Sequence, residues 1–169
     1  MDDQDLRNRR LVFYKADMEK IHAVLNEFLN LSHAICTLLV DKDGHLITQA
    51  GQTSSYNADT ISALVAGSFA ATREMARILG EEEFSILFHQ GRRENIQLAL
   101  VEDRCLVAIV FDESTTLGLV RLYCSDMVDK LARIFRDSRL RGPNANETLS
   151  ESFTKSISQV LDDTFGPSQ

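Results

Sequence analysis

The amino-acid sequence predicts an α/β protein of the α+β type, in which a five-stranded antiparallel sheet has helices on both faces in the order α-β-β-α-β-β-β-α, followed by a helical tail. Five short apolar runs have the length of strands, three longer segments have the apolar spacing of helices, and only a few residues connect the last three strands. Such short connections join antiparallel neighbours. Cys105–Phe111 is apolar on both faces, which is typical of a central strand covered by helices.

The first half of the chain predicts a helix followed by a β-hairpin. Residues 1–13 are mostly polar, and we expect a flexible N-terminus there. A helix is expected over Tyr14–Leu31, because apolar residues recur at helical spacing at Met18, Ile21, Leu25, Phe28 and Leu29. Two strand-like segments, Ile35–Val40 and His45–Ala50, flank a turn that ends in Gly44, and together they predict the hairpin.

The second half predicts a long helix, three strands and a last helix. The long helix is capped by Asn57 or Asp59 and ends at Leu79, before Gly80. The strands are expected at Phe84–Gln90, Asn95–Val101 and Cys105–Phe111. Thr115 or Thr116 caps the last helix, whose expected core positions are Leu119, Leu122, Val128, Leu131 and Phe135.

The domain is therefore expected to span residues 14–135. Residues 136–148 contain Gly142 and Pro143, which predicts a linker. Residues 149–169 are predicted to form a tail, since Leu149–Phe165 has apolar residues at amphipathic spacing.

Composition excludes several classes of function. The 169-residue chain has a formal net charge of −7, an isoelectric point near 5.1 and no Trp, so nucleic acid is not an expected partner. No stretch approaches the roughly 20 apolar residues of a membrane span. The cysteines are few and scattered, at Cys36, Cys105 and Cys124, which favours a reducing compartment. We expect a cytoplasmic protein.

The residue types that carry catalysis do not form a recognisable pattern. The four histidines are separated and show no zinc-ligand spacing, and neither GxxxxGK nor GxGxxG occurs. The acidic run Glu81–Glu83 is better explained as a solvated turn than as a metal cluster. We therefore expect no catalytic residues, no metal and no cofactor.

The second helix is the most informative segment. Its spacing predicts a stripe over the sheet at Ile61, Leu64, Val65, Ser68, Ala71, Met75 and Leu79. The opposite side then carries small residues, with Phe69 on its flank and charges around them: Asp59, Ser62, Ala63, Ala66, Phe69, Ala70, Arg73, Glu74 and Arg77. Small side chains allow another backbone to approach, which predicts a docking surface. Alanine as a simple helix former on a solvent-facing side is an equal alternative.

A second prediction concerns the strand after this helix. Phe84, Ile86 and Phe88 alternate along a strand that is expected at the edge of the sheet, where an apolar strand favours pairing with a second copy. Val65 and Phe69 of the second helix would complete this dimer interface. The alternative is an edge shielded by a loop or by Glu81–Glu83.

Several strings between Tyr14 and Phe135 resemble the Roadblock family (dynein light chain-like). The matching strings are Leu39-Val40-Asp41-Lys42-Asp43-Gly44 with Leu46-Ile47, Ala50-Gly51-Gln52-Thr53, Leu64-Val65-Ala66-Gly67, Ile78-Leu79-Gly80-Glu81 with Glu83-Phe84, Phe88-His89-Gln90-Gly91, and Val110-Phe111-Asp112 with Thr116-Leu117-Gly118-Leu119-Val120-Arg121-Leu122.

This resemblance implies a homodimer formed through the third strand and second helix. Bacterial members bind a small Ras-like GTPase on the paired second helices and stimulate GTP hydrolysis without an arginine finger. Small contact residues of the family fall at Ala70 and Glu74, and Glu74 departs from the pattern. The resemblance also implies a role in cell polarity or motility, with enrichment at a cell pole.

Two alternatives remain open at this level. The tail, whose end Val160-Leu161-Asp162-Asp163-Thr164-Phe165 is loosely similar to the family's, either aids nucleotide exchange or folds back on its own domain. The protein as a whole is either a GTPase-activating regulator or a dimeric scaffold that tethers a GTPase or another partner without changing nucleotide turnover.

Overall fold

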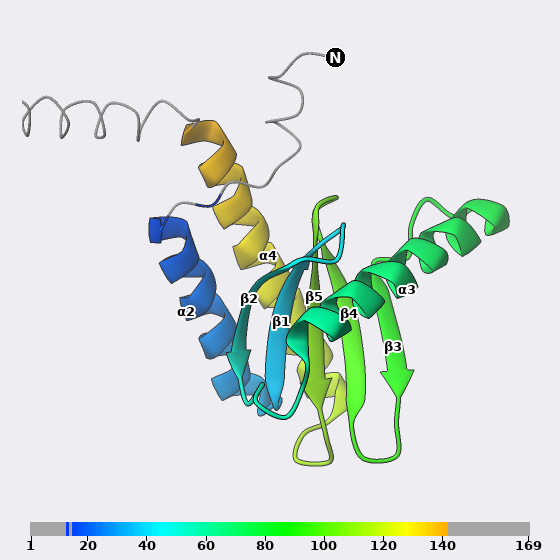
Figure 1. Cartoon of the computed structure of the whole chain (residues 1–169), viewed down its shortest axis with the longest axis horizontal. Coiled ribbons are helices and arrows are strands. Elements are labelled where there is room, and N and C mark those ends of the chain that lie inside the picture. Colours follow the sequence, from blue (N-terminus) through cyan, green and yellow to red (C-terminus); the bar gives the residue numbers. More distant parts are fainter. Residues whose placement is uncertain (1–12, 14, 142–169) are drawn as a thin grey trace, which may run out of the picture. The chain divides into compact units, whose positions relative to one another are not determined.

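The computed structural model describes residue 13 and residues 15–141, and the chain divides into two compact units, residues 1–134 and 135–169. The predictions for residues 1–12 and for the tail lie outside the described residues. The elements follow the predicted order (Figure 1): α2 Lys15–Ser32, β1 Cys36–Asp41, β2 Leu46–Gly51, α3 Ala58–Leu79, β3 Ile86–Gln90, β4 Asn95–Val101, β5 Cys105–Phe111 and α4 Leu117–Arg141.

The five strands form one sheet in the order β2-β1-β5-β4-β3, and every neighbouring pair is antiparallel (Figure 1). One row across its middle joins Leu38, Ala108 and Leu98. Each residue of β5 is buried. The sequence-based prediction of a central Cys105–Phe111 strand is therefore confirmed.

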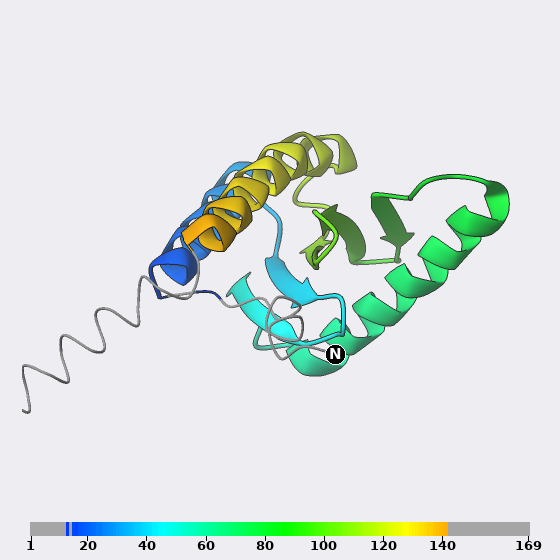
Figure 2. The same cartoon turned by 90° about the horizontal axis from the view of Figure 1, so that it is seen from above.

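Helices cover both faces of the sheet. Helix α3 lies on one face, while α2 and α4 lie on the other (Figure 2). The face under α3 forms a buried apolar cluster, which includes Cys36, Leu38, Val40, Leu98, Leu106, Ala108 and Val110 of the strands. These residues alternate with the ones that face α2 and α4, as the period of two along a strand requires.

The ends of α3 and α4 confirm the predicted caps. The Asn57 side chain accepts a hydrogen bond from the Thr60 N–H at 3.0 Å, and Gly80 ends α3 in the left-handed conformation with φ of 76°. At the start of α4, Thr116 Oγ1 accepts from the Leu119 N–H at 3.2 Å.

Three boundaries or faces differ from the prediction. Helix α4 continues to Arg141, so a linker cannot begin at residue 136. After Gly118 in the first turn of the helix, the next Gly or Pro residues are Gly142 and Pro143. Strand β3 begins at Ile86 rather than Phe84. Leu122 was expected in the core but is 64% exposed.

The buried stripe of the first part of α4 has a different phase from the one predicted. It runs through Val120, Cys124, Met127 and Leu131, which follow one another at helical spacing. Cys124 takes a core position here as a small apolar residue. Among the described helices, none is both long and apolar enough to cross a bilayer.

Candidate interaction surface

The side chains most often used in catalysis and metal binding are the histidines, the cysteines and the carboxylates. No group of three or more His, Cys, Asp and Glu side chains among the described residues is placed to hold a metal ion. The Nε2 atom of His22 lies 2.8 Å from Thr48 Oγ1, and the Nδ1 atom of His45 lies 3.1 Å from Asp41 Oδ2. Each of these two histidines therefore has one side-chain hydrogen-bond partner.

The three cysteines are free and buried. Burial raises the pKa of Cys36 to about 11, of Cys105 to about 12 and of Cys124 to about 11. Since the thiolate is the nucleophilic form, these thiols are unsuited to covalent catalysis near neutral pH.

Helix α3 contacts the sheet through a stripe of mostly small residues. The buried members are Ser62, Val65, Ala66, Phe69, Thr72 and Ala76. The predicted face of the helix is therefore wrong for Ser62, Ala66 and Phe69, which were expected to meet the GTPase. It is equally wrong for Val65 and Phe69 as dimer contacts, because both side chains pack into the chain's own core.

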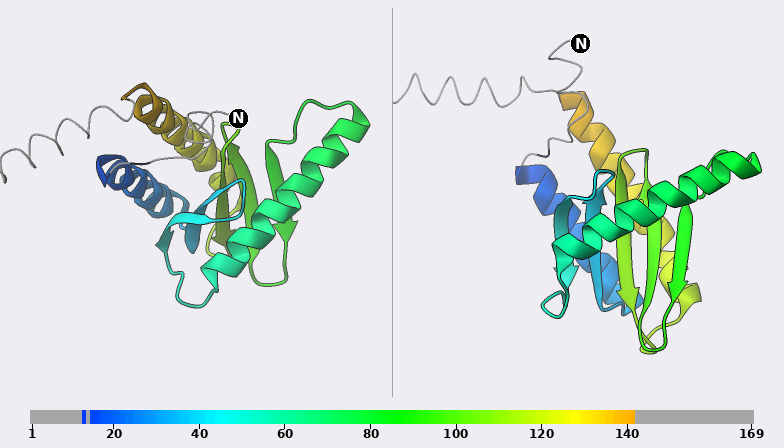
Figure 3. Two further views of the ribbon diagram at one scale, coloured as in Figure 1. Left: turned by 45° about the horizontal axis from the view of Figure 1, so that its top comes forward. Right: turned by 45° about the vertical axis from the view of Figure 1, so that its right-hand side comes forward.

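The small residues of α3 allow another segment of backbone to approach closely, and this segment is the β1–β2 turn of the same chain. A Cβ atom added to Gly44, whose φ is 93°, would lie 3.1 Å from the Cα of Ala63 and 3.6 Å from the Cβ of Ala66. The β1–β2 turn thus rests directly on α3 (Figure 3). Ala63 and Ala66 are small because this turn approaches so closely.

A second apolar stripe of α3 is exposed. The sequence placed Leu64, Met75 and Leu79 over the sheet, yet the solvent-exposed apolar side chains of the helix are Leu64 at 65%, Met75 at 52%, Ile78 at 72% and Leu79 at 70%. Counting about 100° per residue, Leu64, Ala71 and Met75 fall on one line along the helix. This exposed stripe was present in the sequence pattern but was assigned to the core.

The remaining predicted contact residues of α3 are exposed, as expected: Asp59, Ala63, Ala70, Arg73, Glu74 and Arg77. Within this set, the Arg77 Nε donates to both carboxylate oxygens of Glu74 at 3.1 Å, and its Nη2 also donates to Glu74. The hydrogen bond from Arg77 lowers the pKa of Glu74. Glu74 therefore orients an arginine on this side of the helix.

Strand β3 lies at the edge of the sheet, as predicted. Its outer side has no neighbouring strand within the described residues, and Ile86 is 48% exposed. Phe84 and Phe88 are half-buried, and the Phe88 ring stacks on Phe111 with 6.2 Å between ring centres. The edge therefore offers an unpaired backbone together with apolar side chains.

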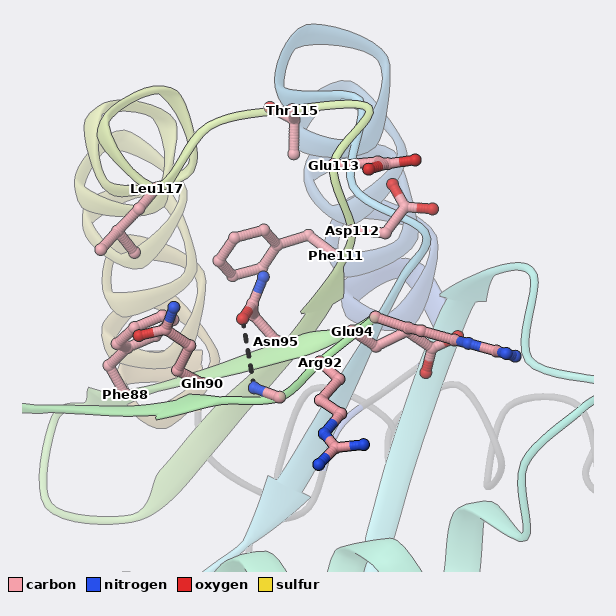
Figure 4. A pocket seen from close by; sticks show the side chains of 12 residues that line it. Phe88, Gln90, Arg92, Glu94, Asn95, Phe111, Asp112, Glu113, Thr115 and Leu117 are labelled. Carbon is pink, nitrogen blue, oxygen red and sulfur yellow. Dashed lines mark hydrogen bonds between the residues drawn. The ribbon is translucent and has the colours of Figure 1, made fainter.

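A pocket of about 720 Å³ lies beside the end of β3 (Figure 4). Phe88, Phe111 and Leu117 supply its apolar wall, and the β3–β4 turn forms the rim. That turn is held by a hydrogen bond from the Gly91 N–H to Asn95 Oδ1 at 3.3 Å. Sequence analysis missed the pocket because its residues come from two separate segments, the β3–β4 hairpin and the connection from β5 to α4, that only the folded chain brings together.

The five-stranded antiparallel sheet with α3 on one face and α2 and α4 on the other defines the class of fold to which the protein belongs. A Roadblock/LC7 domain model matches residues 20–111, which is more than half of the chain, and the protein belongs to the Roadblock/LC7 family.

Within the family, the solved structures of MglB are similar to this chain. Myxococcus xanthus MglB is 37% identical, with 75% of this chain and 96% of that chain covered and a TM-score of 0.71. The gliding protein MglB from Thermus thermophilus is 35% identical over 75% and 96%, with a TM-score of 0.71. An MglB with a tetrameric arrangement is 34% identical over 76% and 96%, with a TM-score of 0.72. No curated protein matches the chain.

Proposed function

We propose that the protein is a homodimeric regulator that binds a small Ras-like GTPase similar to MglA and stimulates its GTP hydrolysis. One observation carries the proposal: α3 buries one stripe on its own sheet and leaves a second apolar stripe exposed, while the edge strand β3 has no neighbouring strand on its outer side within the described residues. The likeness to MglB supports it. Bacterial cell polarity or motility is the proposed setting, in the cytoplasm with enrichment at a pole.

The dimer forms through β3 and α3. Two copies of β3 pair across a two-fold axis, which removes the open edge and joins the sheets. Ala63 and Ala66, which lie against the β1–β2 turn, are on the opposite side of the helix from Leu64 and Met75. The exposed stripe therefore lies on the side of α3 away from that turn, and the second copy covers it in the proposed dimer, since α3 crosses the sheet and its C-terminal end lies beyond β3 (Figure 1).

The GTPase docks on the outward side of the paired α3 helices. The proposed contact residues are the exposed members of the predicted set, namely Asp59, Ala63, Ala70, Arg73, Glu74 and Arg77. Ala70 lets the GTPase approach the helix backbone. Glu74 and Arg77 already form an ion pair on the free surface. Removing water from a preformed ion pair costs less free energy than removing it from two separate charges, so the pair can be buried in the interface.

Stimulation is proposed to act through the conformation of the GTPase. A regulator that binds the hydrolysis-competent conformation more tightly increases its population, so the catalytic groups of the GTPase become aligned. Arg77 is held by Glu74 along the helix, and this geometry does not resemble an arginine that reaches into a nucleotide site. The protein itself contributes no group to the reaction.

The direct test measures single-turnover GTP hydrolysis by a co-encoded MglA-like GTPase with and without this protein. We expect faster hydrolysis that saturates with the concentration of dimer. Binding without acceleration would identify a tethering scaffold instead, and absence of binding would exclude both functions. Release of a fluorescent GDP analogue, compared between the full chain and a chain lacking residues 149–169, tests whether the tail aids nucleotide exchange.

A further inference from the structure

Opposite charges lie at the two ends of strand β3. Glu81, Glu82 and Glu83 precede the strand, and Arg92 and Arg93 follow it. All five side chains are exposed, and none forms an ion pair with another described residue. Within one copy the two groups are separated by the whole length of the strand, so they cannot neutralise each other.

A two-fold axis brings these ends together. When two copies of an edge strand pair antiparallel, the beginning of one lies beside the end of the other. Phe88 is the centre of the five-residue strand, and an axis there pairs every residue of β3. Ile86 then lies opposite Gln90 of the second copy, and Glu83 lies opposite Arg93.

The alternation of side chains decides which face Phe84 takes. Ile86 and Phe88 pair with Ala99 and Gln97, so they share one face of the sheet. Continuing the alternation by two residues puts Phe84 on that same face. The pocket beside Phe88 opens on this face, because Phe88 contributes to its wall.

We propose that each copy closes the rim of the other's pocket: Glu81–Glu83 bind Arg92 and Arg93 of the second copy, and Phe84 lies opposite Arg92 of the second copy, beside the pocket. This inference rests on the proposed dimer and adds its register and its charge dependence. The two-fold axis repeats the arrangement, so one dimer contains two such charged clamps.

The pocket lining carries charges of both signs: Arg92 and Arg93 lie on the β3–β4 turn, and Glu94, Asp112 and Glu113 provide the carboxylates. Asp112, on the other loop, accepts a hydrogen bond from the Ser114 N–H at 2.9 Å, and hydrogen bonding to Ser114 lowers its pKa. Burial, together with a hydrogen bond to Glu94, raises the pKa of Tyr56 to about 12. Asp112 and Glu94 form hydrogen bonds with the uncharged Ser114 and Tyr56, whereas Arg92 and Arg93 form no ion pair with a described residue, so the two arginines remain available to an acidic segment. In Figure 4 the Arg92 side chain points away from the apolar wall.

Charge reversal in two complementary chains tests the clamp. One chain carries Arg92→Glu with Arg93→Glu, and the other carries Glu82→Arg with Glu83→Arg. Each chain alone places like charges together, so we expect its dimer dissociation constant, measured by sedimentation equilibrium, to rise about tenfold or more at low salt. Mixing the two chains restores opposite charges at both clamps, and the heterodimer should form with nearly the wild-type constant.

Controls separate the clamp from the dimer itself. Arg121→Glu, an exposed charge reversal on α4, should leave dimerisation unchanged. Wild-type dimerisation in either reversed chain, or no recovery on mixing, would overturn the clamp while leaving the proposed dimer intact. A wild-type chain that stays monomeric would overturn the dimer itself. If a reversed chain fails to fold by circular dichroism, Arg92→Gln with Arg93→Gln replaces it: a weaker dimer with less salt dependence supports the clamp, and an unchanged one contradicts it.

Discussion

Gly44 is the residue that fixes how closely the β1–β2 turn lies on α3. Its φ of 93° is strained for any other residue, and a Cβ there would lie 3.1 Å from the Cα of Ala63. We expect Gly44→Ala to lower the free energy of unfolding by about 1–3 kcal/mol. Denaturant unfolding measures this change. Gly67→Ala is the matched control, because its Cβ meets nothing within 4 Å and alanine favours a helix; a similar loss in both variants would contradict the explanation.

Ala70 tests the docking side of α3. Its side chain is exposed, so Ala70→Arg should leave the fold and the dimer unchanged. A long charged side chain at this position should raise the dissociation constant for the GTPase at least about a hundredfold, since it holds the two surfaces apart. Titration calorimetry gives the affinity. Ser125→Arg, at an exposed site on α4, is the control; equal affinity for both variants would place the docking side elsewhere.

The exposed arginines test whether the regulator supplies a catalytic group. We expect Arg73→Ala and Arg77→Ala, assayed at saturating regulator, to keep the stimulated rate of GTP hydrolysis within about threefold. Loss of an arginine finger costs about a thousandfold or more. Single-turnover hydrolysis distinguishes these magnitudes. A loss of that size at saturation, in either variant, would show that the arginine acts in the nucleotide site.

At the scale of an element, the exposed stripe of α3 should control assembly. Met75→Glu with Ile78→Glu places two charges where the second copy is expected to cover the helix. Burying them without partners is unfavourable, so the variant should be monomeric at micromolar concentration and remain folded. Light scattering measures the oligomeric state, and circular dichroism measures the fold. Leu122→Glu is the control, since this leucine is 64% exposed on α4. If the control variant also became monomeric, the exposed stripe of α3 would not be the surface that controls assembly.

The sequence allowed the elements to be predicted well, because their signals are local. Strands β4 and β5 begin and end at the predicted residues, and the caps at Asn57 and Gly80 are the predicted ones. Turn glycines, capping side chains and apolar periods all act over a few residues. Helix α4 extends beyond its predicted end for the same kind of reason, since neither Gly nor Pro occurs between Gly118, in its first turn, and Gly142.

The face of α3 could not be predicted from its pattern. The helix has two apolar stripes, one through Val65 and Phe69 and another through Leu64 and Met75, and hydrophobicity favours burial of either. What decides between them is a distant contact, the approach of Gly44 to Ala63. Contacts between residues far apart in the chain leave no periodic signal in the sequence, and the pocket beside β3 was missed for this reason too.

At the scale of the whole molecule, burial of the thiols predicts a dependence of stability on pH. The pKa values of Cys36, Cys105 and Cys124 rise from an ordinary 9.0 to about 11, about 12 and about 11. Above pH 9 the unfolded chain loses these protons while the folded chain keeps them, which favours unfolding. Below pH 9 the thiols should therefore cause no change of the melting temperature with pH. Between pH 9 and about pH 12 the melting temperature should fall as the pH rises. Cys124→Ala should make this fall less steep; an equally steep fall would assign it to other groups.

The C-terminal half of α3 extends beyond the sheet with Met75, Ile78 and Leu79 in solvent (Figure 2). In the proposed assembly, the platform for the GTPase exists only where two chains meet. When most chains are monomeric, the concentration of dimer grows with the square of the local concentration of the chain. A modest accumulation of the protein at one place in the cell then produces a much larger increase in GTP hydrolysis there. A helix that is left half uncovered in the single chain would in this way convert a gradient of protein into a sharp boundary of activity.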